Sequence, residues 1–397
     1  MSAAVHLPVA VSSAIQKLND AGFEAYAVGG CVRDSLLGRK PDDWDITTSA
    51  LPQDMQSVFA EYRTIETGLK HGTLTVLMNG VPLEITSYRV DGAYSDGRHP
   101  DTVCFTRSLD EDLKRRDFTI NAMAYHPHAG LIDLFNGQED LAAGVVRCVG
   151  EPCKRFSEDA LRILRALRFA SVLGFRTDTK TEIALRTLSP TLSRVSAERI
   201  YAELSKLLCG ASVSRVLHDY SCVIYEILPE IRSTDAFECL TRVPPTRAAR
   251  FAALFWSELY DPQMVETALR RLRMDQRTMR DVLTLLSARG MPLATDSDAL
   301  RLLNRLDDTN LIHDYLSLCN ADDELRRRVE RLLAEKRCYK VAMLAVNGSD
   351  LLAAGVRNGP EIGNILNRLL DAVIDEVCSN DKESLLSYVA TIKKPVQ

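Results

Sequence analysis

Apolar and polar positions follow two different patterns along the chain. Up to about Gly150, apolar runs of strand length alternate with turn residues, which predicts a domain of mixed strands and helices. Beyond that point leucines recur three residues apart, as at Leu161, Leu164 and Leu167, which is typical of a helix with one buried face. We therefore expect a small mixed sheet followed by small, almost wholly helical subdomains.

Turn residues divide the first part into separate elements. The expected elements are strands at 24–28 and 45–48, a helix at 32–37, and two strands at 73–78 and 81–88. Asn79-Gly80 separates the last two runs, and both residues tolerate positive φ, so this pair predicts a tight hairpin. In the second part, Pro360 after Gly359 marks the start of a new helix.

Composition indicates a globular protein rather than a membrane protein. Of 397 residues, 46% are hydrophobic and 26% charged, and no stretch approaches the roughly 20 apolar residues that span a bilayer. The ten cysteines form no C-x-x-C pair, and the start of the chain does not resemble a signal peptide, so we expect a cytoplasmic protein. A net charge of −5 means that any nucleic acid must bind at local clusters of Lys and Arg. No obligate protein partner is expected.

The first candidate chemistry is a glycine pair followed by two aspartates. Gly29-Gly30 comes directly after a predicted strand, where backbone N–H groups can approach a phosphate closely. Asp43 and Asp45 are two residues apart, so in a strand their carboxylates share one face. Such a pair suits Mg²⁺, which keeps coordination positions open for substrate phosphates. The alternative is a solvated, Asp-rich turn.

Glu84 lies in the second strand of the predicted hairpin. It can supply a third carboxylate that helps to orient or deprotonate an attacking hydroxyl. The alternative is a surface glutamate on an edge strand.

Several blocks together carry a family resemblance. Gly29-Gly30-x-Val32-Arg33-Asp34, followed by Asp43-x-Asp45, resembles the signature of class II tRNA nucleotidyltransferases and bacterial poly(A) polymerases, within the polymerase-β-like superfamily. The further matching blocks, in the same order, are Asp91-x-x-Tyr94-x-Asp96-x-Arg98, Arg115-Arg116-Asp117 and Glu158-Asp159-x-x-Arg162. The likeness covers residues 28 to about 169, is looser at 346–360, and is weak between about 210 and 340.

The resemblance implies an α+β fold with a polymerase-β-like nucleotidyltransferase head. The implied parts are a catalytic head at 1–149, a base-recognising neck at 150–212, a helical body at 213–320 and a tRNA-binding tail at 321–397. The implied reaction is template-independent addition and repair of the 3′-terminal CCA of tRNA from CTP and ATP. Two Mg²⁺ ions would be held by Asp43 and Asp45, and the nucleotide phosphates by Gly29, Gly30 and Arg33.

The same resemblance makes Asp159 and Arg162 the readers of the base. Cytosine and adenine both present an amino donor beside a ring-nitrogen acceptor, which a carboxylate and a guanidinium match; uracil and guanine present the reverse. On a continuous helix from Glu158 to Phe169, Asp159 and Arg162 are neighbours, and Arg165 and Arg168 continue toward the triphosphate or the tRNA end. The alternatives are an ordinary surface ion pair and solvated arginines.

The resemblance assigns two further sites. Asp117 would accept a hydrogen bond from the ribose 2′-OH with Arg116 assisting, although an aspartate at a helix start is the alternative. The Gly-rich stretch at 91–100 would be a mobile loop that switches specificity from C to A.

Two basic runs in the helical part are candidates for tRNA phosphates. One comprises Arg326, Arg327, Arg328, Arg331, Lys336, Arg337 and Lys340, and the other Arg270, Arg271, Arg273, Arg277 and Arg280. Binding would follow the shape of stacked A-form helices rather than sequence. Solvated helix faces are the alternative.

Other functions remain open at this point. An enzyme that adds only A is not separated from one that adds CCA. A poly(A) polymerase would carry an Arg-Phe segment that is missing at 64–77, and a catalytically dead RNA-binding protein would be expected to lose Asp43, Asp45, Asp159 and Arg162. His218-Asp219 and His313-Asp314 lack the further histidine of an HD phosphohydrolase.

Overall fold

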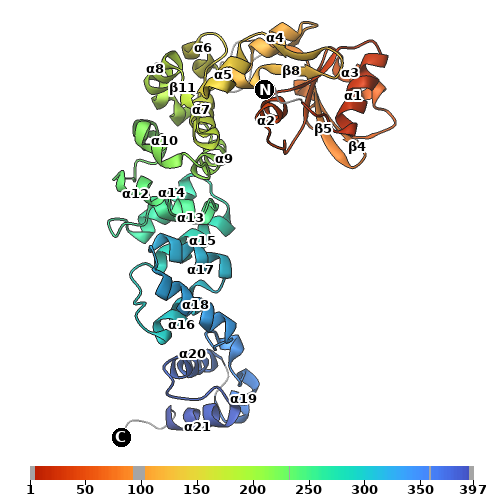
Figure 1. Ribbon diagram of the computed structural model, residues 1–397. Coiled ribbons are helices and arrows are strands. Elements are labelled where there is room, and N and C mark those ends of the chain that lie inside the picture. Colours follow the sequence, from red (N-terminus) through yellow and green to blue (C-terminus); the bar gives the residue numbers. More distant parts are fainter. Residues whose placement is uncertain (1–4, 93–102, 232, 357–358, 393–397) are drawn as a thin grey trace. The chain divides into compact units, whose positions relative to one another are not determined.

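The computed structural model describes residues 5–92, 103–231, 233–356 and 359–392. Its internal contacts divide the chain into two compact units, residues 1–229 and 230–397 (Figure 1). The strands lie in the first unit, and helices make up the described part of the second. The α+β fold expected from the sequence is confirmed. The finer division into four parts stays a prediction.

A seven-stranded mixed sheet forms the core of the first unit. In spatial order its strands are β3 (Arg63–Ile65), β4 (Thr73–Met78), β5 (Val81–Ser87), β2 (Asp45–Thr48), β1 (Ala25–Val28), β8 (Met123–His126) and β9 (Gly130–Asp133). All neighbours are antiparallel except β2 and β5, which run parallel. Asn79 and Gly80 join β4 to β5 with φ of 54° and 78°, so the predicted hairpin is confirmed.

Helices cover both faces of the sheet. Those of the sheet region are α1 (Val9–Asp20), α2 (Gly30–Leu36), α3 (Pro52–Val58), α4 (Leu109–Lys114) and the 3₁₀ turns η1 (Leu69–His71) and η2 (Thr119–Asn121). Val28 and Ala124 pack against Leu113 of α4. Thr47 lies on the same face, because its side chain bonds to Asp112 of α4. Since alternate residues share a face, Asp45 belongs to this side too.

The rest of the first unit is helical apart from two small ribbons. The helices are α5 (Gly137–Ala143), α6 (Pro152–Glu158), α7 (Leu161–Leu173), α8 (Thr179–Leu188), η3 (Ser189–Arg194), α9 (Ala197–Leu208), α10 (Val213–Asp219) and α11 (Ser221–Ile227). The ribbons pair β6 (Arg89–Asp91) with β7 (Val103–Phe105) and β10 (Val145–Val146) with β11 (Arg176–Thr177). Helix α7 packs on α9, and Phe169 of α7 makes an edge contact with Phe118 below the sheet, which ties these helices to the head.

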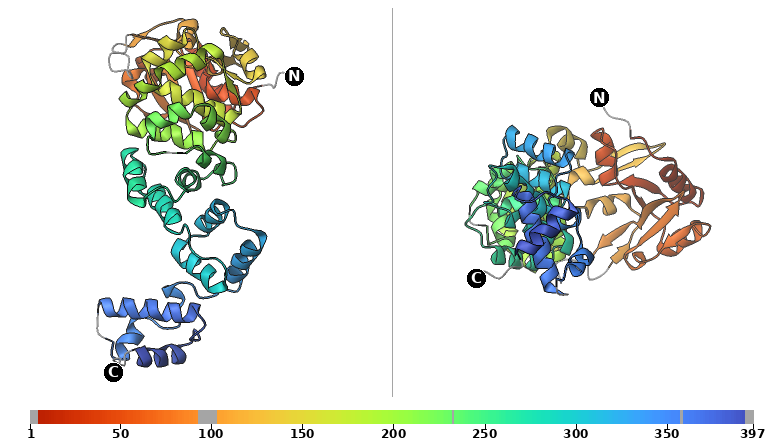
Figure 2. Two further views of the ribbon diagram at one scale, coloured as in Figure 1. Left: turned by 90° about the vertical axis from the view of Figure 1, so that its left-hand side faces the viewer. Right: turned by 90° about the horizontal axis from the view of Figure 1, so that it is seen from below.

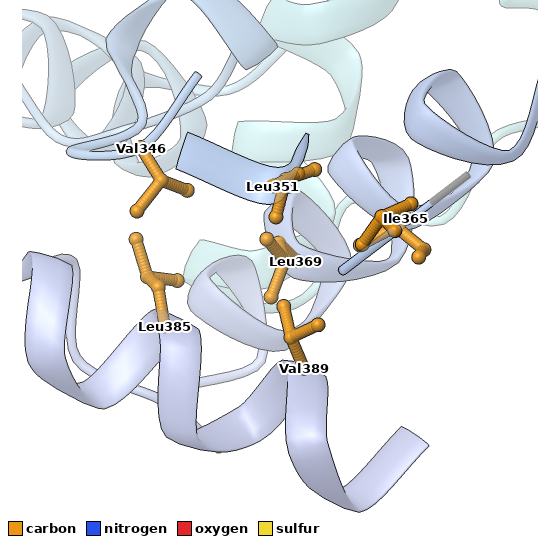
Figure 3. Packing of buried hydrophobic residues seen from close by; sticks show 7 residues of the cluster. Val346, Leu351, Ile365, Leu369, Leu385 and Val389 are labelled. Atoms are coloured by element: carbon orange, nitrogen blue, oxygen red, sulfur yellow. The ribbon is translucent and has the colours of Figure 1, made fainter. Parts of the chain in front are cut away.

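The second unit is built from successively packed helices (Figure 2). They are α12 (Asp235–Cys239), α13 (Arg247–Leu254), α14 (Pro262–Arg271), α15 (Gln276–Ser287), α16 (Asp296–Leu306), α17 (Thr309–Leu318), α18 (Asp323–Ala334), η4 (Val341–Met343), α19 (Gly348–Ala353), α20 (Pro360–Ile374) and α21 (Lys382–Ile392). The last three helices close around Leu351, Leu369 and Leu385, which are fully buried (Figure 3). Pro360 opens α20, as expected.

Two expectations about the whole chain can be compared with the structure. All ten cysteines are free thiols. Within the described ranges, no helix combines the length and the apolar character needed to cross a bilayer.

Candidate active site

Three carboxylates interact where β2 and β5 run side by side. Asp45 is the first residue of β2 and is paired in register with Glu84 of β5, so the two side chains lie next to each other on one face. Burial raises the pKa of Asp45 to about 6; the charge of Arg116 opposes this rise, whereas those of Asp43 and Glu84 add to it. A cation beside Asp45 would relieve the repulsion and favour the ionised carboxylate.

Asp43 lies just outside the strand. The alternation of side chains nevertheless continues through it, because Asp43 is exposed, Trp44 is buried and Asp45 is partly exposed. Among the residues that the structure describes, no three Asp, Glu, His or Cys side chains are grouped so that they could hold a metal ion. Asp43 and Asp45 offer two carboxylates, a set that would fit Mg²⁺ because that ion keeps waters and substrate phosphates as its other ligands.

The glycine pair lies against two guanidinium groups. Gly29 follows β1 and is the N-cap of α2, with φ of 84°, a conformation that favours glycine. A Cβ atom on Gly29 would lie 3.2 Å from Nη1 of Arg116, and one on Gly30 would lie 3.7 Å from Nη2 of Arg33. The backbone turn and the two positive groups together form a surface suited to a triphosphate.

Arg33 is largely committed to neighbouring side chains. Its Nε and Nη2 donate to the two carboxylate oxygens of Asp34 at 2.9 and 2.8 Å, and its Nη1 donates to Oδ1 of Asn121 at 2.7 Å. The guanidinium also lies 5.0 Å from the ring centroid of Phe169. Of its five N–H groups, two remain for a ligand. Arg33 is thus a buried support that can still face a phosphate beside Gly30.

Asp112 is a buried carboxylate shared by two arginines. It is fully buried in α4 and accepts hydrogen bonds from Oγ1 of Thr47 and Nε of Arg115, both at 2.9 Å, and from Nη2 of Arg116 at 3.3 Å. Burial acts to raise the pKa of Asp112, but the charges of Arg116 and Arg115 outweigh it and hold the pKa below its usual value. Asp112 therefore stays ionised and ties Arg116 to the strand that carries Asp45.

Arg116 retains hydrogen-bonding capacity. Its Nη1 faces Gly29 and its Nη2 bonds to Asp112, while its Nε is buried and has no hydrogen-bond partner among the described residues. A buried donor of this kind is costly unless a ligand or water uses it. Since Arg116 also acts electrostatically on Asp45, it is placed between the glycine turn and the carboxylates.

Asp117 is held by donors on every side. Its Oδ1 accepts from the backbone N–H of Phe118 at 2.8 Å and from Nδ2 of Asn121 at 3.1 Å, and its Oδ2 accepts from Nε of Arg165 at 2.8 Å. Burial opposes ionisation, but Arg165 and these bonds lower the pKa of Asp117 to about 2. A ribose hydroxyl would have to share Asp117 with these donors.

Arg165 and Arg168 both turn toward α9. Nη2 of Arg165 lies 2.6 Å from Asp117, and Nη1 lies 3.6 Å from Glu203. Nε of Arg168 lies 2.6 Å from Glu203, and its guanidinium lies 4.1 Å from the ring centroid of Phe169. Both arginines are therefore engaged in the first unit's own ion pairs in this state.

The structure corrects the expectation of one helix from Glu158 to Phe169. Helix α6 ends at Glu158, Asp159 is extended with φ of −148° and ψ of 105°, and α7 starts only at Leu161. Oδ1 of Asp159 accepts the backbone N–H of Leu161 at 3.1 Å, which stabilises the break. Asp159 and Arg162 thus flank a junction between two helices instead of sharing one helix face.

Each of the two residues predicted to read the base has another ion partner. Nη2 of Arg199 in α9 donates to Oδ2 of Asp159 at 2.7 Å, and Nη1 of Arg162 donates to Glu158 at 2.6 Å. Arg199, Glu203 and Asp112 were not singled out by sequence reasoning. The signal in the sequence was the pair of opposite charges at Arg199 and Glu203, which are four residues apart and therefore neighbours on one helix face.

Part of the predicted specificity loop lies outside the described residues. These include Tyr94, Asp96 and Arg98. The described base of the loop is the β6–β7 ribbon, in which Asp91 pairs with Val103. The ribbon is anchored at Phe105, whose ring would lie 2.7 Å from a Cβ atom on Gly72, so only glycine fits there.

Family models match three segments of the chain. Residues 25–147 match the poly A polymerase head domain, residues 174–231 a probable RNA and SrmB-binding site of polymerase A, and residues 244–389 a putative tRNA nucleotidyltransferase domain 2. The first segment contains the carboxylates, the glycine pair and the Arg116–Asp117 block.

Known proteins resemble the chain over nearly its whole length. The CCA-adding enzyme of Leuconostoc mesenteroides is 36% identical over 381 residues, 94% of each chain, and that of Streptococcus mutans is 35% identical, covering 97% of this chain and 98% of its own. The crystal structure of the Bacillus stearothermophilus CCA-adding enzyme in complex with CTP aligns with a TM-score of 0.79 at 32% identity, covering 96% of both chains. Enzymes of this family generally use divalent metal ions. The chain belongs to the family of CCA-adding tRNA nucleotidyltransferases.

Proposed function

We propose that this enzyme adds and repairs the 3′-terminal CCA of tRNA without a template, using CTP and ATP and releasing pyrophosphate. The family membership supports the reaction, and the solved relatives include complexes with CTP, ATP and tRNA. The observation that carries the proposal is the interaction of Asp43, Asp45 and Glu84 beside the glycine pair. An enzyme acting on tRNA belongs in the cytoplasm, and we place it there.

Asp43 and Asp45 are the residues that would hold two Mg²⁺ ions. The ions, when bound, supply Lewis-acid activation of the tRNA 3′-OH and neutralise charge on the departing pyrophosphate. The raised pKa of Asp45 means that its carboxylate is a better ligand above pH 6 than below it. Glu84, next to Asp45 in the paired strand, is placed to accept a hydrogen bond from the attacking hydroxyl.

The triphosphate would lie against the glycine turn. The backbone N–H of Gly30, in the first turn of α2, and the guanidinium groups of Arg116 and Arg33 offer donors there, whereas the N–H of Gly29 donates to the carbonyl of Met123 at 3.2 Å. Asp112 fixes Arg116, and Asp34 and Asn121 fix Arg33. Donors that are already oriented lose little entropy on binding, which favours in-line attack on the α-phosphate.

Asp159 and Arg162 would select the base. Arg199 orients the carboxylate of Asp159, which accepts hydrogen bonds, and Glu158 orients Arg162, which is a donor only. Cytosine and adenine satisfy both groups, whereas uracil or guanine leaves each without a proper partner, at a cost of about 1–3 kcal/mol per group. Asp117 would bind the ribose, with Arg165 and Arg168 completing the wall of the site.

Incorporation assays separate the competing activities. Purified enzyme is incubated with Mg²⁺, tRNA transcripts that end before CCA or after CC, and either single NTPs or CTP and ATP together. We expect C and then A to be added to the first transcript and A to the second. Addition of A to the second transcript alone would indicate an A-adding enzyme. Growth of a long A tail would indicate a poly(A) polymerase. A complete lack of incorporation would indicate a catalytically inactive RNA-binding protein.

A further inference from the structure

The two basic runs of the second unit have different surroundings. In the run on α18 and the segment after it, four cations are neutralised by carboxylates. These pairs are Arg328 and Arg331 with Asp296, Arg337 with Glu376, and Lys340 with Asp307. Arg326 and Arg327 donate to backbone carbonyl groups near the start of α18. Most of this run therefore stabilises the fold and is not available to a ligand in this state.

In the run on α14 and α15, Arg271 pairs with Glu230, and the two arginines near the start of α15 have no ion partner from another segment among the described residues. Arg270 is paired with Glu266, one turn away on the same helix. Arg277 is exposed and takes part in no ion pair or hydrogen bond within the described part of the chain. The Arg280 side chain is 73% exposed. Among the described residues it forms an ion pair with its sequence neighbour Asp281, whose Oδ1 lies 3.6 Å from Nε of Arg280. Arg277 and Arg280 are three residues apart, so they project from one side of α15.

An open groove lies beside these arginines. It has a volume of about 740 Å³ and is lined by the start of α14, one face of α15 and Arg305 at the end of α16. Arg305 donates to Oγ of Ser287 at 2.9 Å and has no carboxylate partner among the described residues. Glu266 is the one carboxylate that lines the groove among the residues that the structure describes, and Arg270 already pairs with it. The groove therefore has a local positive charge on a chain whose net charge is −5.

The other polar lining residues are also suited to phosphate. Gln276 and Thr284 present an amide and a hydroxyl group along the face of α15 that bears Arg280, whereas the hydroxyl of Ser287 donates to the carbonyl of Thr284 and holds Arg305. Guanidinium, amide and hydroxyl groups are the donors that proteins use for the sugar–phosphate backbone. An acidic protein segment could be held by the same charges, but neutral amide and hydroxyl donors spread along one helix face favour a repeating backbone.

We propose that this groove, lined by Arg280 and Arg305 and with Arg277 one helical turn before Arg280 on α15, binds backbone phosphates of the tRNA, and that the α18 run does not. The proposal rests on the proposed function, since it names the surface that holds that enzyme's RNA substrate. It resolves a choice between two basic runs that composition and spacing leave open. Binding here depends on charge and RNA shape rather than on base sequence.

The test compares two double variants with the same change in charge. Arg277→Gln with Arg280→Gln alters the groove, and Arg327→Gln with Lys336→Gln alters exposed positions of the other run. The full-length proteins are titrated with a labelled tRNA transcript that ends before CCA, over a series of KCl concentrations. For the groove variant we expect Kd to rise roughly tenfold and the slope of log Kd against log salt to fall by about one to two. The matched control should stay within about twofold of wild type, as solvated charges do.

Steady-state kinetics separate this proposal from the proposed function. The groove variant should show a raised KM for tRNA with unchanged kcat and unchanged KM for CTP. An unchanged Kd in a folded groove variant, or an equal loss in the control, would overturn the groove assignment while wild-type C and A addition still supported the enzyme. A wild-type protein that binds tRNA at the groove but adds no nucleotide would overturn the proposed function and leave the groove standing.

Discussion

At the scale of single residues, Asp45 shows a conflict between stability and activity. Its folded pKa of about 6 lies above the model-peptide value of 3.8, so the folded protein favours the protonated form. The stability that this preference contributes is complete below about pH 3.8 and is lost as the pH rises through 6. An ionised, metal-free Asp45 therefore destabilises the protein under the conditions in which it would bind metal.

Replacement of Asp45 by Asn should separate the two effects. We expect Asp45→Asn to abolish nucleotide transfer yet to stabilise the metal-free protein at pH 8 by roughly 1–3 kcal/mol, because the amide carries no charge to desolvate. The gain should vanish near pH 4. Denaturant unfolding of both proteins at the two pH values, without divalent ions, checks this. A variant less stable than wild type at pH 8 would contradict the assigned environment of Asp45.

The base readers give a second prediction at this scale. Asp159→Ala should relax base choice, so that discrimination of CTP against UTP falls by roughly tenfold or more. Arg199→Ala should also lower the discrimination of CTP against UTP, but by less, because it frees the Asp159 side chain without removing it. Arg199→Lys should restore part of the lost discrimination. Competition assays with paired NTPs measure the ratio. If UTP stays excluded in Asp159→Ala, Asp159 does not read the base.

At the scale of elements, α4 holds Arg116, a residue that we propose binds the triphosphate. In Asp112→Asn the buried guanidinium groups of Arg115 and Arg116 lose their counter-charge, so we expect a loss of about 3–5 kcal/mol in stability. In the protein that remains folded, KM for CTP should rise while KM for tRNA stays unchanged, because Arg116 faces the glycine turn. Asp110→Asn, an exposed change in the same helix, is the matched control and should stay within about 0.5 kcal/mol of wild type. Equal changes in both KM values would contradict a specific role.

Local sequence determined some elements and not others. The Asn79-Gly80 hairpin was predictable because two residues of that type fix the turn by themselves. The break at Asp159 was not, because leucine spacing from Leu161 onward is compatible with a helix that starts earlier, and the extended residue is held by Arg199 from a distant helix. The same holds for the site: the carboxylates and glycines lie in short motifs, whereas Asp112 and Glu203 act through contacts that only the fold creates.

At the scale of the whole molecule, the catalytic and the proposed RNA-binding residues lie in different compact units. The carboxylates belong to residues 1–229 and the groove to residues 230–397. Sequence composition located both basic runs but could not show which was neutralised, since the partners Asp296, Asp307 and Glu376 come from other segments.

This separation predicts a different response of binding and catalysis to metal removal. With EDTA in excess, nucleotide transfer should stop, while Kd for tRNA should change by less than about twofold at constant ionic strength, because guanidinium contacts need no metal. Parallel transfer and anisotropy assays test this. A large loss of tRNA affinity on chelation would show that the ions also hold the RNA.

The most direct test of the account is a crystal structure of the enzyme with CTP and Mn²⁺ in place of Mg²⁺, read by anomalous diffraction. The account predicts Mn²⁺ peaks coordinated by the carboxylates of Asp43 and Asp45, with the cytosine edge facing Asp159 and Arg162. Mn²⁺ bound elsewhere, or a cytosine that contacts neither side chain, would contradict it.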